Sequence, residues 1–499
     1  LLWIDMFGKS AKKLLPKNGA YTVINGYVYL SAKSKPLLIA IKSLSPRSLR
    51  RTLMNSVARW ETARKGYEDA IKQWEEKPLH TMNAHQIMEG IQTIFYAACI
   101  YFTRIQLTLP AASISETLFT KLFQGAVRRA GITDTSVFLL GFDTIVLQSE
   151  KALWGISEWV KQNNSINLYL QNSSAIKIAE DFMSSVVPVG VSQEVWIEWK
   201  NRINKYFKEF GRTAYEFDFA HSTPQETLTP TFESVKTFVE GKGESPFLRQ
   251  TTFEKRRKHA EEEILQHIGG LRKKLFFKLL HWAQETSPMR ENAIYLMGMG
   301  HPLIRCMFQK ISERFIRGGA ISHLDDIYWL TKSELEVLIE QLDKNKSLSD
   351  MNGIIPVRKA ELKKYMGYVS PSKLPEKNKK TISQEPQKQK DGKIVLTGIG
   401  TSTGVVTAPA CVLNSPADFE SFQPGSVLVA VTTTPAWTPL FSSASAIVTD
   451  IGGPLSHSSI VAREYGIPAV MATHIATRTI KSGQMITVDG LAGTVTFDE

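Results

Sequence analysis

Ala446–Val470 reads AIVTDIGGPLSHSSIVAREYGIPAV, and its residue order predicts a strand, a turn, a short helix and a second strand. The apolar, β-branched run at its start is typical of a buried strand, which the glycines and the proline then end. Ser456 is well placed as a helix N-cap, which puts His457 in the first helical turn, and Gly466 suits the left-handed residue after the helix. We therefore expect a small α/β unit at this end of the chain.

The position of His457 has chemical consequences. The first turn of a helix has unpaired N–H groups and a positive partial charge. Such a site disfavours protonation of the imidazole, leaves a ring nitrogen free as a nucleophile and accommodates a phosphoryl group. A lone histidine is more often structural, but the whole arrangement favours a catalytic role here. The residues expected to contact the phosphoryl group are Gly452, Gly453, Ser456, Ser458 and Ser459.

This stretch strongly resembles the phosphohistidine swivelling domain of the phosphoenolpyruvate (PEP)-utilising enzymes. The resemblance covers about the last hundred residues, including Thr432–Pro435, Pro439–Phe441 and Val488–Gly490. It implies that His457 is phosphorylated at one active site and carries the phosphate to another. Leu455 stands where the dikinases of this family often have threonine, which makes a pyruvate phosphate dikinase a less favoured assignment.

The composition of the chain is that of a globular protein with several domains. It has 499 residues, of which 43% are hydrophobic and 22% charged. No signal peptide or membrane-spanning run is visible, and the three cysteines are too far apart for a metal site, so we expect a cytoplasmic protein with reduced thiols. The net charge of +12 favours anionic ligands or an acidic partner domain, but the basic residues are scattered, so we expect no nucleic-acid partner and no membrane partner.

Most of the preceding chain has helical periodicity. Apolar residues recur every three or four positions between Pro46 and Lys77, and again from Ile87 to Ile105, where the helix is expected to end before Pro110. A new helix is expected to begin at Pro288. Two β-rich runs around Asn25-Gly26 predict a hairpin near residues 21–30.

The expected protein is therefore multidomain. Residues 1–367 form a mainly α-helical central, substrate-binding domain, and residues 394–499 form the small C-terminal α/β swivelling phosphohistidine domain. Residues 368–393 are rich in lysine, glutamine and proline and are expected to be a flexible linker, because such a segment cannot bury enough apolar surface to fold. A carrier domain that visits two active sites needs a tether of this kind.

Two segments of the central region resemble motifs of rifampin phosphotransferase-like proteins. The first contains Arg212, Glu216 and Asp218, whose charges suit a substrate or a metal, although an ion-pair cluster would also explain them. The resemblance favours substrate binding, but Thr213 replaces the family's glycine.

The second motif is Arg290-Glu291. By resemblance Arg290 faces the transferring phosphate, for which a guanidinium is suited, and Glu291 contributes to substrate binding. A surface ion pair is the alternative. Ile294 occupies the position where the antibiotic phosphotransferases have a lysine.

The resemblance implies an ATP-dependent phosphotransferase of the dikinase type, in which the β-phosphate of ATP passes through phospho-His457 to a hydroxyl of a small-molecule acceptor. ATP and Mg²⁺ would bind an N-terminal ATP-grasp domain or separate subunit outside this chain, which starts without methionine and looks like a fragment. One alternative is an ATP-dependent condensing synthetase, similar to those of prodigiosin pathways, that uses the same phosphohistidine. The other is a non-catalytic regulator.

Overall fold

The computed structural model describes residues 21–24, 27–30, 55–132, 135–184, 186–215, 218–366, 387–388, 393–414, 416–454 and 456–498. These residues fall into two compact units. Unit 1 contains residues 1–111, 217–220 and 299–381, and unit 2 contains residues 112–216, 221–298 and 382–499. The predicted central domain of residues 1–367 is thus divided between the two units.

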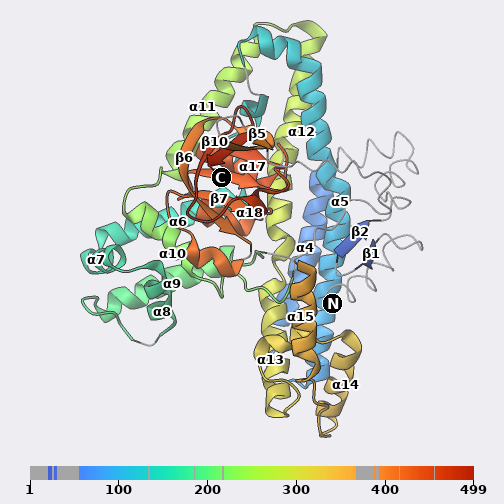
Figure 1. The fold of residues 1–499 in the computed structure, drawn as a ribbon. Helices are drawn as coiled ribbons and strands as arrows, with labels where there is room; N and C mark the ends of the chain where they lie inside the picture. The colour runs from blue at the N-terminus through green and yellow to red at the C-terminus, as the bar shows by residue number, and fades with distance from the viewer. Residues whose placement is uncertain are drawn as a thin grey trace, which may run out of the picture. The chain divides into compact units, whose positions relative to one another are not determined.

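Unit 1 is mainly helical. Its N-terminal strands β1 (Tyr21–Ile24) and β2 (Tyr27–Leu30) pair antiparallel with Ile24 opposite Tyr27, which confirms the predicted hairpin. In α4 the predicted apolar face is buried through Trp60, Tyr67 and Ile71. The helices of this unit are α4 (Ser56–Glu75), the first part of α5 (Ala84–Arg129), α13 (His301–Arg317), α14 (Lys332–Asp343) and α15 (Ile354–Met366), with the 3-10 helix η3 (Leu324–Trp329) (Figure 1).

The helical part of unit 2 surrounds a core of aromatic and aliphatic side chains. Trp199 and Phe232 are fully buried there, with ring centroids 6.0 Å apart. The elements of this part are the end of α5, η1 (Thr135–Leu139), α6 (Ile145–Gln162), α7 (Asn164–Asn172), α8 (Ala175–Met183), α9 (Gln193–Phe210), α10 (Thr229–Val239), α11 (Pro246–Leu265), α12 (Gly270–Tyr295) and η2 (Leu296–Gly298).

The C-terminal part of unit 2 is a mixed sheet, so the predicted combination of a helical region and a C-terminal α/β domain is confirmed. The order of its described strands is β3-β4-β11-β10-β6-β7-β8-β9-β5, and β6 to β9 run parallel. The strands are β3 (Gln387–Lys388), β4 (Lys393–Thr397), β5 (Ile399–Ser402), β6 (Val405–Leu413), β7 (Val427–Ala430), β8 (Ala446–Thr449), β9 (Ala469–Met471), β10 (Met485–Asp489) and β11 (Thr494–Asp498). The helices are η4 (Pro416–Ser421), η5 (Pro435–Trp437), α16 (Thr438–Phe441), α17 (His457–Tyr465) and α18 (Ala476–Thr479).

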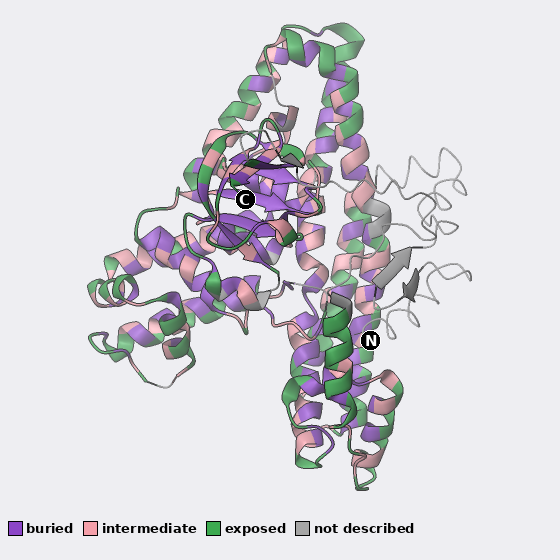
Figure 2. Ribbon diagram, in the orientation of Figure 1, coloured by how far each residue is buried: buried purple, intermediate pink, exposed green. Residues whose placement is uncertain are grey.

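The middle of this sheet is covered on both faces. Val427 and Val429 of β7 belong to one apolar cluster, whereas Leu428 and Ala430 belong to another. Successive side chains of a strand point to opposite faces, and a parallel strand buried on both sides therefore reads as a continuous apolar run. Figure 2 shows the resulting buried strands at the centre of the domain.

Between α15 and β4 only Gln387–Lys388 is described, and it pairs with β4. The rest of the predicted linker lies outside the described residues.

Two predicted helix boundaries are wrong. Helix α5 continues through Pro110, and α12 continues through Pro288 from its start at Gly270. A proline inside a helix removes one backbone hydrogen bond. Directly after these prolines Ala111, Ala112 and Met289 are buried, so tertiary packing holds the helical path.

Candidate functional site

His457 lies where the sequence places it, as the first residue of α17. The side chain of Ser456 accepts the N–H of Ser459 as the N-cap, and Gly466 ends the helix in the left-handed conformation with φ 67°. Both capping predictions are confirmed. Because β8 ends at Thr449, the short segment Asp450–Ser456 delivers the imidazole to the carboxyl edge of the parallel strands, where α/β sheets usually form their sites.

A second polar segment reaches the same edge from the neighbouring strand. The segment after β7 contains Thr433, whose hydroxyl lies 2.8 Å from the Ser458 hydroxyl, and Thr438, whose Oγ1 lies 3.3 Å from Nε2 of His457. Since β7 and β8 are adjacent and parallel, their following loops must meet. The two loops together therefore hold one ring nitrogen beside a hydroxyl.

The other ring nitrogen contacts a carboxylate from the helical part of the same unit. Nδ1 of His457 lies 3.0 Å from Oε2 of Glu291 on α12, and Oε1 of Glu291 lies 3.5 Å from Nη1 of Arg290. Burial would raise the pKa of Glu291, but the hydrogen bond from His457 and the charge of Arg290 outweigh it and lower the pKa below its ordinary value. Glu291 is therefore ionised at neutral pH.

This geometry fixes which nitrogen can react. An ionised carboxylate only accepts hydrogen bonds, so Nδ1 carries a hydrogen, and the lone pair of a neutral ring is then on Nε2. Thr438 donates its hydroxyl hydrogen to the carbonyl of Pro435, 2.6 Å away, and its oxygen lies 3.3 Å from Nε2. The ring is only 5% exposed and packs edge-to-face against Phe441, yet both of its nitrogens face polar groups. The arrangement is that of a nucleophile with an orienting base behind it.

The residues predicted to contact phosphate surround this turn. Ser458 and Ser459 are buried, and in this structure Ser459 donates its hydroxyl hydrogen to the carbonyl of Gly453 and lies 2.9 Å from the Ser456 hydroxyl. Gly453 has open space where a Cβ would be, whereas a Cβ on Gly452 would lie 3.2 Å from the Thr449 hydroxyl. Phosphate binding by this group stays a prediction.

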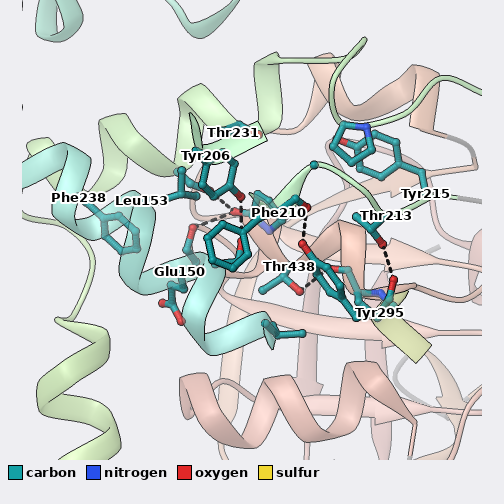
Figure 3. A pocket seen from close by; sticks show the side chains of 18 of the residues that line it. Glu150, Leu153, Tyr206, Phe210, Thr213, Tyr215, Thr231, Phe238, Tyr295 and Thr438 are labelled. Atoms are coloured by element: carbon teal, nitrogen blue, oxygen red, sulfur yellow. Dashed lines mark hydrogen bonds between the residues drawn. The ribbon is translucent and has the colours of Figure 1, made fainter. Parts of the chain in front are cut away.

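A cavity lies next to Thr438 (Figure 3). Its walls come from α6, α9, α10 and the segment after α9, and on the other side from the C-terminal domain. The cavity volume is about 30 Å³, which is room for one or two waters. The C-terminal domain contributes Pro435, Thr438, Pro439, Ser442 and Tyr465 to the lining.

The C-terminal domain is fixed on this side by further contacts with the helical part. The Thr434 hydroxyl is 3.1 Å from the carbonyl of Ala214 and 3.0 Å from that of Tyr215, and Ser234 donates to the carbonyl of Pro439. The Tyr215 ring packs at 87° against Phe419 of the C-terminal domain.

The other predicted substrate-binding residues lie differently. Arg212 is partly buried between Gly211 and Thr213, which both line the cavity, but it does not line the cavity itself. Asp218 is exposed, belongs to unit 1 and accepts a hydrogen bond from the backbone of Ala220. Glu216 lies outside the described residues. The structure thus brings Glu291 and Arg290 to His457, whereas Asp218 belongs to the other unit.

Sequence reasoning missed Thr438 and the contact between Glu291 and His457. Thr438 stands between the two family segments Thr432–Pro435 and Pro439–Phe441, so its position was a usable signal. The contact of Glu291 joins residues 166 positions apart, and no spacing rule reports it. Thr213, which replaces the family's glycine, donates to the carbonyl of Tyr295 at 3.2 Å and so closes the cavity wall.

Within the described ranges no group of three or more His, Cys, Asp or Glu side chains is arranged to hold a metal ion. The described helices include none with the length and apolar character to cross a membrane.

Two family descriptions match the chain. Residues 108–291 match the rifampicin phosphotransferase fourth domain, and residues 422–493 match the mobile domain of PEP-utilising enzymes. Arg290 and Glu291 end the first match, and His457 lies in the second.

Three curated relatives extend these matches. The uncharacterized phosphotransferase YvkC of Bacillus subtilis is 28% identical over 70% of this chain and 42% of its own length. Rifampicin phosphotransferase of the same species is 29% identical over 59% of this chain and 34% of its own length. Chondramide synthase of Chondromyces crocatus is 24% identical over 97% of this chain and 13% of its own length. The chain spans less than half the length of each of these relatives.

Proposed function

We propose that this chain, which joins a rifampicin phosphotransferase fourth domain to a PEP-utilising mobile domain, carries a phosphoryl group on Nε2 of His457 to a hydroxyl of a small molecule. These domains support a phosphotransfer function in general. ATP as the phosphate source, and an ATP-grasp part that supplies it with Mg²⁺, are parts of the proposal. The observation that supports it most is the Glu291–His457–Thr438 arrangement beside a cavity.

The proposed transfer has two steps. In the first, the lone pair of Nε2 attacks the phosphorus of the donor, and the bond from phosphorus to the leaving oxygen breaks. In the second, the acceptor oxygen attacks the phosphorus on Nε2, the P–N bond breaks, and its electron pair returns to the ring. The hydroxyl proton goes to Nε2, and the carboxylate of Glu291 stabilises the imidazolium that forms.

Arg290 supports the transfer as a fixed positive charge. Its side chain is 14% exposed and is oriented by the contact with Glu291. A guanidinium in this place binds phosphoryl oxygens through two donors and offsets the charge that moves during transfer. Arg290 is therefore proposed to act on transfer to the acceptor.

The lining of the cavity suits a neutral hydroxyl compound. The hydroxyls of Thr213, Tyr295, Ser234, Ser442 and Thr438 all donate to backbone carbonyls, so they face the cavity with lone pairs. No lysine, arginine or histidine belongs to the described lining, which gives an anionic acceptor no counter-charge. A hydroxyl group that donates hydrogen bonds satisfies these walls.

A condensation reaction is the second candidate. The relative that aligns with 97% of this chain is named a chondramide synthase, and Ile294 occupies the lysine position of the antibiotic phosphotransferases. In that reading, transfer from phospho-His457 activates an oxygen of one substrate as a leaving group for the other. Mass spectrometry of products from pairs of condensable substrates separates the two outcomes.

The test of the carrier role is labelling. Incubation with ATP and an ATP-grasp partner is expected to place an acid-labile, base-stable phosphate on His457, and His457→Ala is expected to remove it. His474, which lies in the same domain, gives a matched control, because His474→Ala is expected to keep the label. A label that persists in His457→Ala would overturn the proposal.

A further inference from the structure

Helix α17 is held at both of its ends by the helical part of unit 2. At its first residue the imidazole of His457 binds Glu291. At its last residue the ring of Tyr465 lies under the guanidinium of Arg249 from α11, with the Arg249 Cζ 4.3 Å from the ring centroid. The second contact lies more than two helical turns from the imidazole of His457, and Tyr465 also lines the cavity beside Thr438.

Arg249 is itself part of a buried ion pair. It donates to Glu150 of α6, and both side chains are only 6% exposed. Two buried charges are costly unless their surroundings keep water out and satisfy them. The Tyr465 ring lies against the Arg249 guanidinium, and the Tyr465 side chain also hydrogen-bonds Glu150. A cation over an aromatic ring is most stabilising where water is excluded.

We infer that Arg249, held by Glu150, is a positioning residue: it captures the Tyr465 ring and so holds the mobile domain with His457 at the acceptor cavity. The inference rests on the proposed function, since it assumes that the domain leaves this position to be loaded. Glu150 and Arg249 both belong to the helical part, so they stay paired when the domain departs. Within this group, only the contacts of Tyr465 break and form again. Each return of the domain restores a contact whose receiving site is already formed.

The inference predicts opposite effects on loading and delivery. Weakening the Arg249–Tyr465 contact exposes His457 more often, so loading by a small donor becomes faster, while transfer to the acceptor becomes slower. A simple defect in folding would slow both steps. The direction of the two changes therefore separates a positioning role from a structural one.

The experiment uses Tyr465→Leu in the full chain and potassium phosphoramidate, which phosphorylates imidazole nitrogen and releases ammonia. We expect loading of His457 to rise about 10- to 30-fold, the population change that a desolvated cation–π contact supports. Tyr465→Phe keeps the ring face over Arg249 but loses the hydroxyl interaction with Glu150, so it is expected to change loading less than Tyr465→Leu does. The double variant Glu150→Leu/Arg249→Met removes both charges together, which avoids leaving one buried alone, and is expected to behave as Tyr465→Leu does.

Arg256→Met is the matched control. Arg256 is exposed on the same helix and lies 5.9 Å from the ring of Phe253, so loading should stay at the wild-type rate. If Tyr465→Leu loads and delivers at wild-type rates, the positioning role is refuted while the carrier function stands. If it loads faster but no acceptor is phosphorylated by any variant or by wild type, the positioning role stands and the proposed function fails.

Discussion

At the scale of single residues, the two nitrogens of the His457 imidazole have different partners and therefore different roles. Nδ1 is held by an ionised carboxylate, and Nε2 lies 3.3 Å from the Thr438 hydroxyl, which lines the cavity. Glu291 is predicted by resemblance to bind substrate, but here its carboxylate contacts the ring. Its position explains how a buried imidazole keeps one defined tautomer.

Replacing Glu291 by glutamine tests the role of its carboxylate at Nδ1. Glu291→Gln keeps the shape but removes the charge that stabilises the imidazolium, so single-turnover transfer is expected to slow by about 10²-fold or more. Glu285→Gln is the control, because Glu285 contacts His281 at 3.3 Å on the same helix but on an exposed surface. Equal transfer rates in wild type and Glu291→Gln would contradict the assigned role.

How far the sequence predicts the site depends on the range of the interactions. Ser456, His457 and Gly466 follow local rules of helix capping, and all three lie where those rules place them. The pairing of His457 with Glu291 depends on packing between a helix of one domain and a helix of another. Spacing along the chain does not contain that information.

At the scale of elements, α17 carries a carboxyl group, that of Glu464, whose protonation is linked to the position of the C-terminal domain. Burial raises the pKa of Glu464, near the end of this helix, to about 7. The charges of Arg249 of α11 and Arg463 oppose this rise, and those of Glu291 of α12 and Glu150 of α6 add to it. We call the C-terminal domain docked when it contacts the helical part of unit 2 as in this structure. When it leaves, the Glu464 carboxyl would be exposed and its pKa would return to its ordinary, lower value. The docked state therefore binds a proton more tightly than the undocked state does.

This linkage gives the docked state a pH dependence with a definite sign. Protonation of Glu464 stabilises the docked state below about pH 7. This stabilisation is lost as the pH rises to 7, and at higher pH docking no longer depends on this group. Between pH 6 and pH 8 the docking equilibrium is expected to weaken about tenfold. Phosphoramidate loading of His457 reports it, and comparison with Glu464→Gln removes the pH effects that do not come from Glu464.

A pH profile of Glu464→Gln that matches the wild-type profile would refute this linkage. A flatter profile in the variant is the expected result.

Helix boundaries show where local rules fail. Thr331 and Glu334 form a capping box at the start of α14, and such caps depend on neighbouring residues only. Pro110 and Pro288 did not end their helices, because buried residues beside them hold the helix through tertiary contacts. Proline weakens a helix locally, and packing overrides it.

At the scale of the whole molecule, the C-terminal domain belongs to the same compact unit as the residues it docks on. The sequence predicts the helical region and the C-terminal α/β domain, since their periodicities differ, and both are present. It does not predict that the helical region divides between two units, because residues 217–220 and 299–381 join the N-terminal part through long-range packing. That division puts Asp218 in the unit that lacks His457.

The most direct test of the central claim is a single-turnover chase. Protein phosphorylated on His457 is isolated and mixed with uncharged alcohols and phenols, or with pyruvate, and phosphate is followed on the protein and on each compound. We expect phosphate to leave His457 at the rate at which it appears on a hydroxyl compound, faster than hydrolysis and without transfer to pyruvate. Loss of phosphate to water alone, or transfer to pyruvate in preference to every hydroxyl compound, would contradict the account.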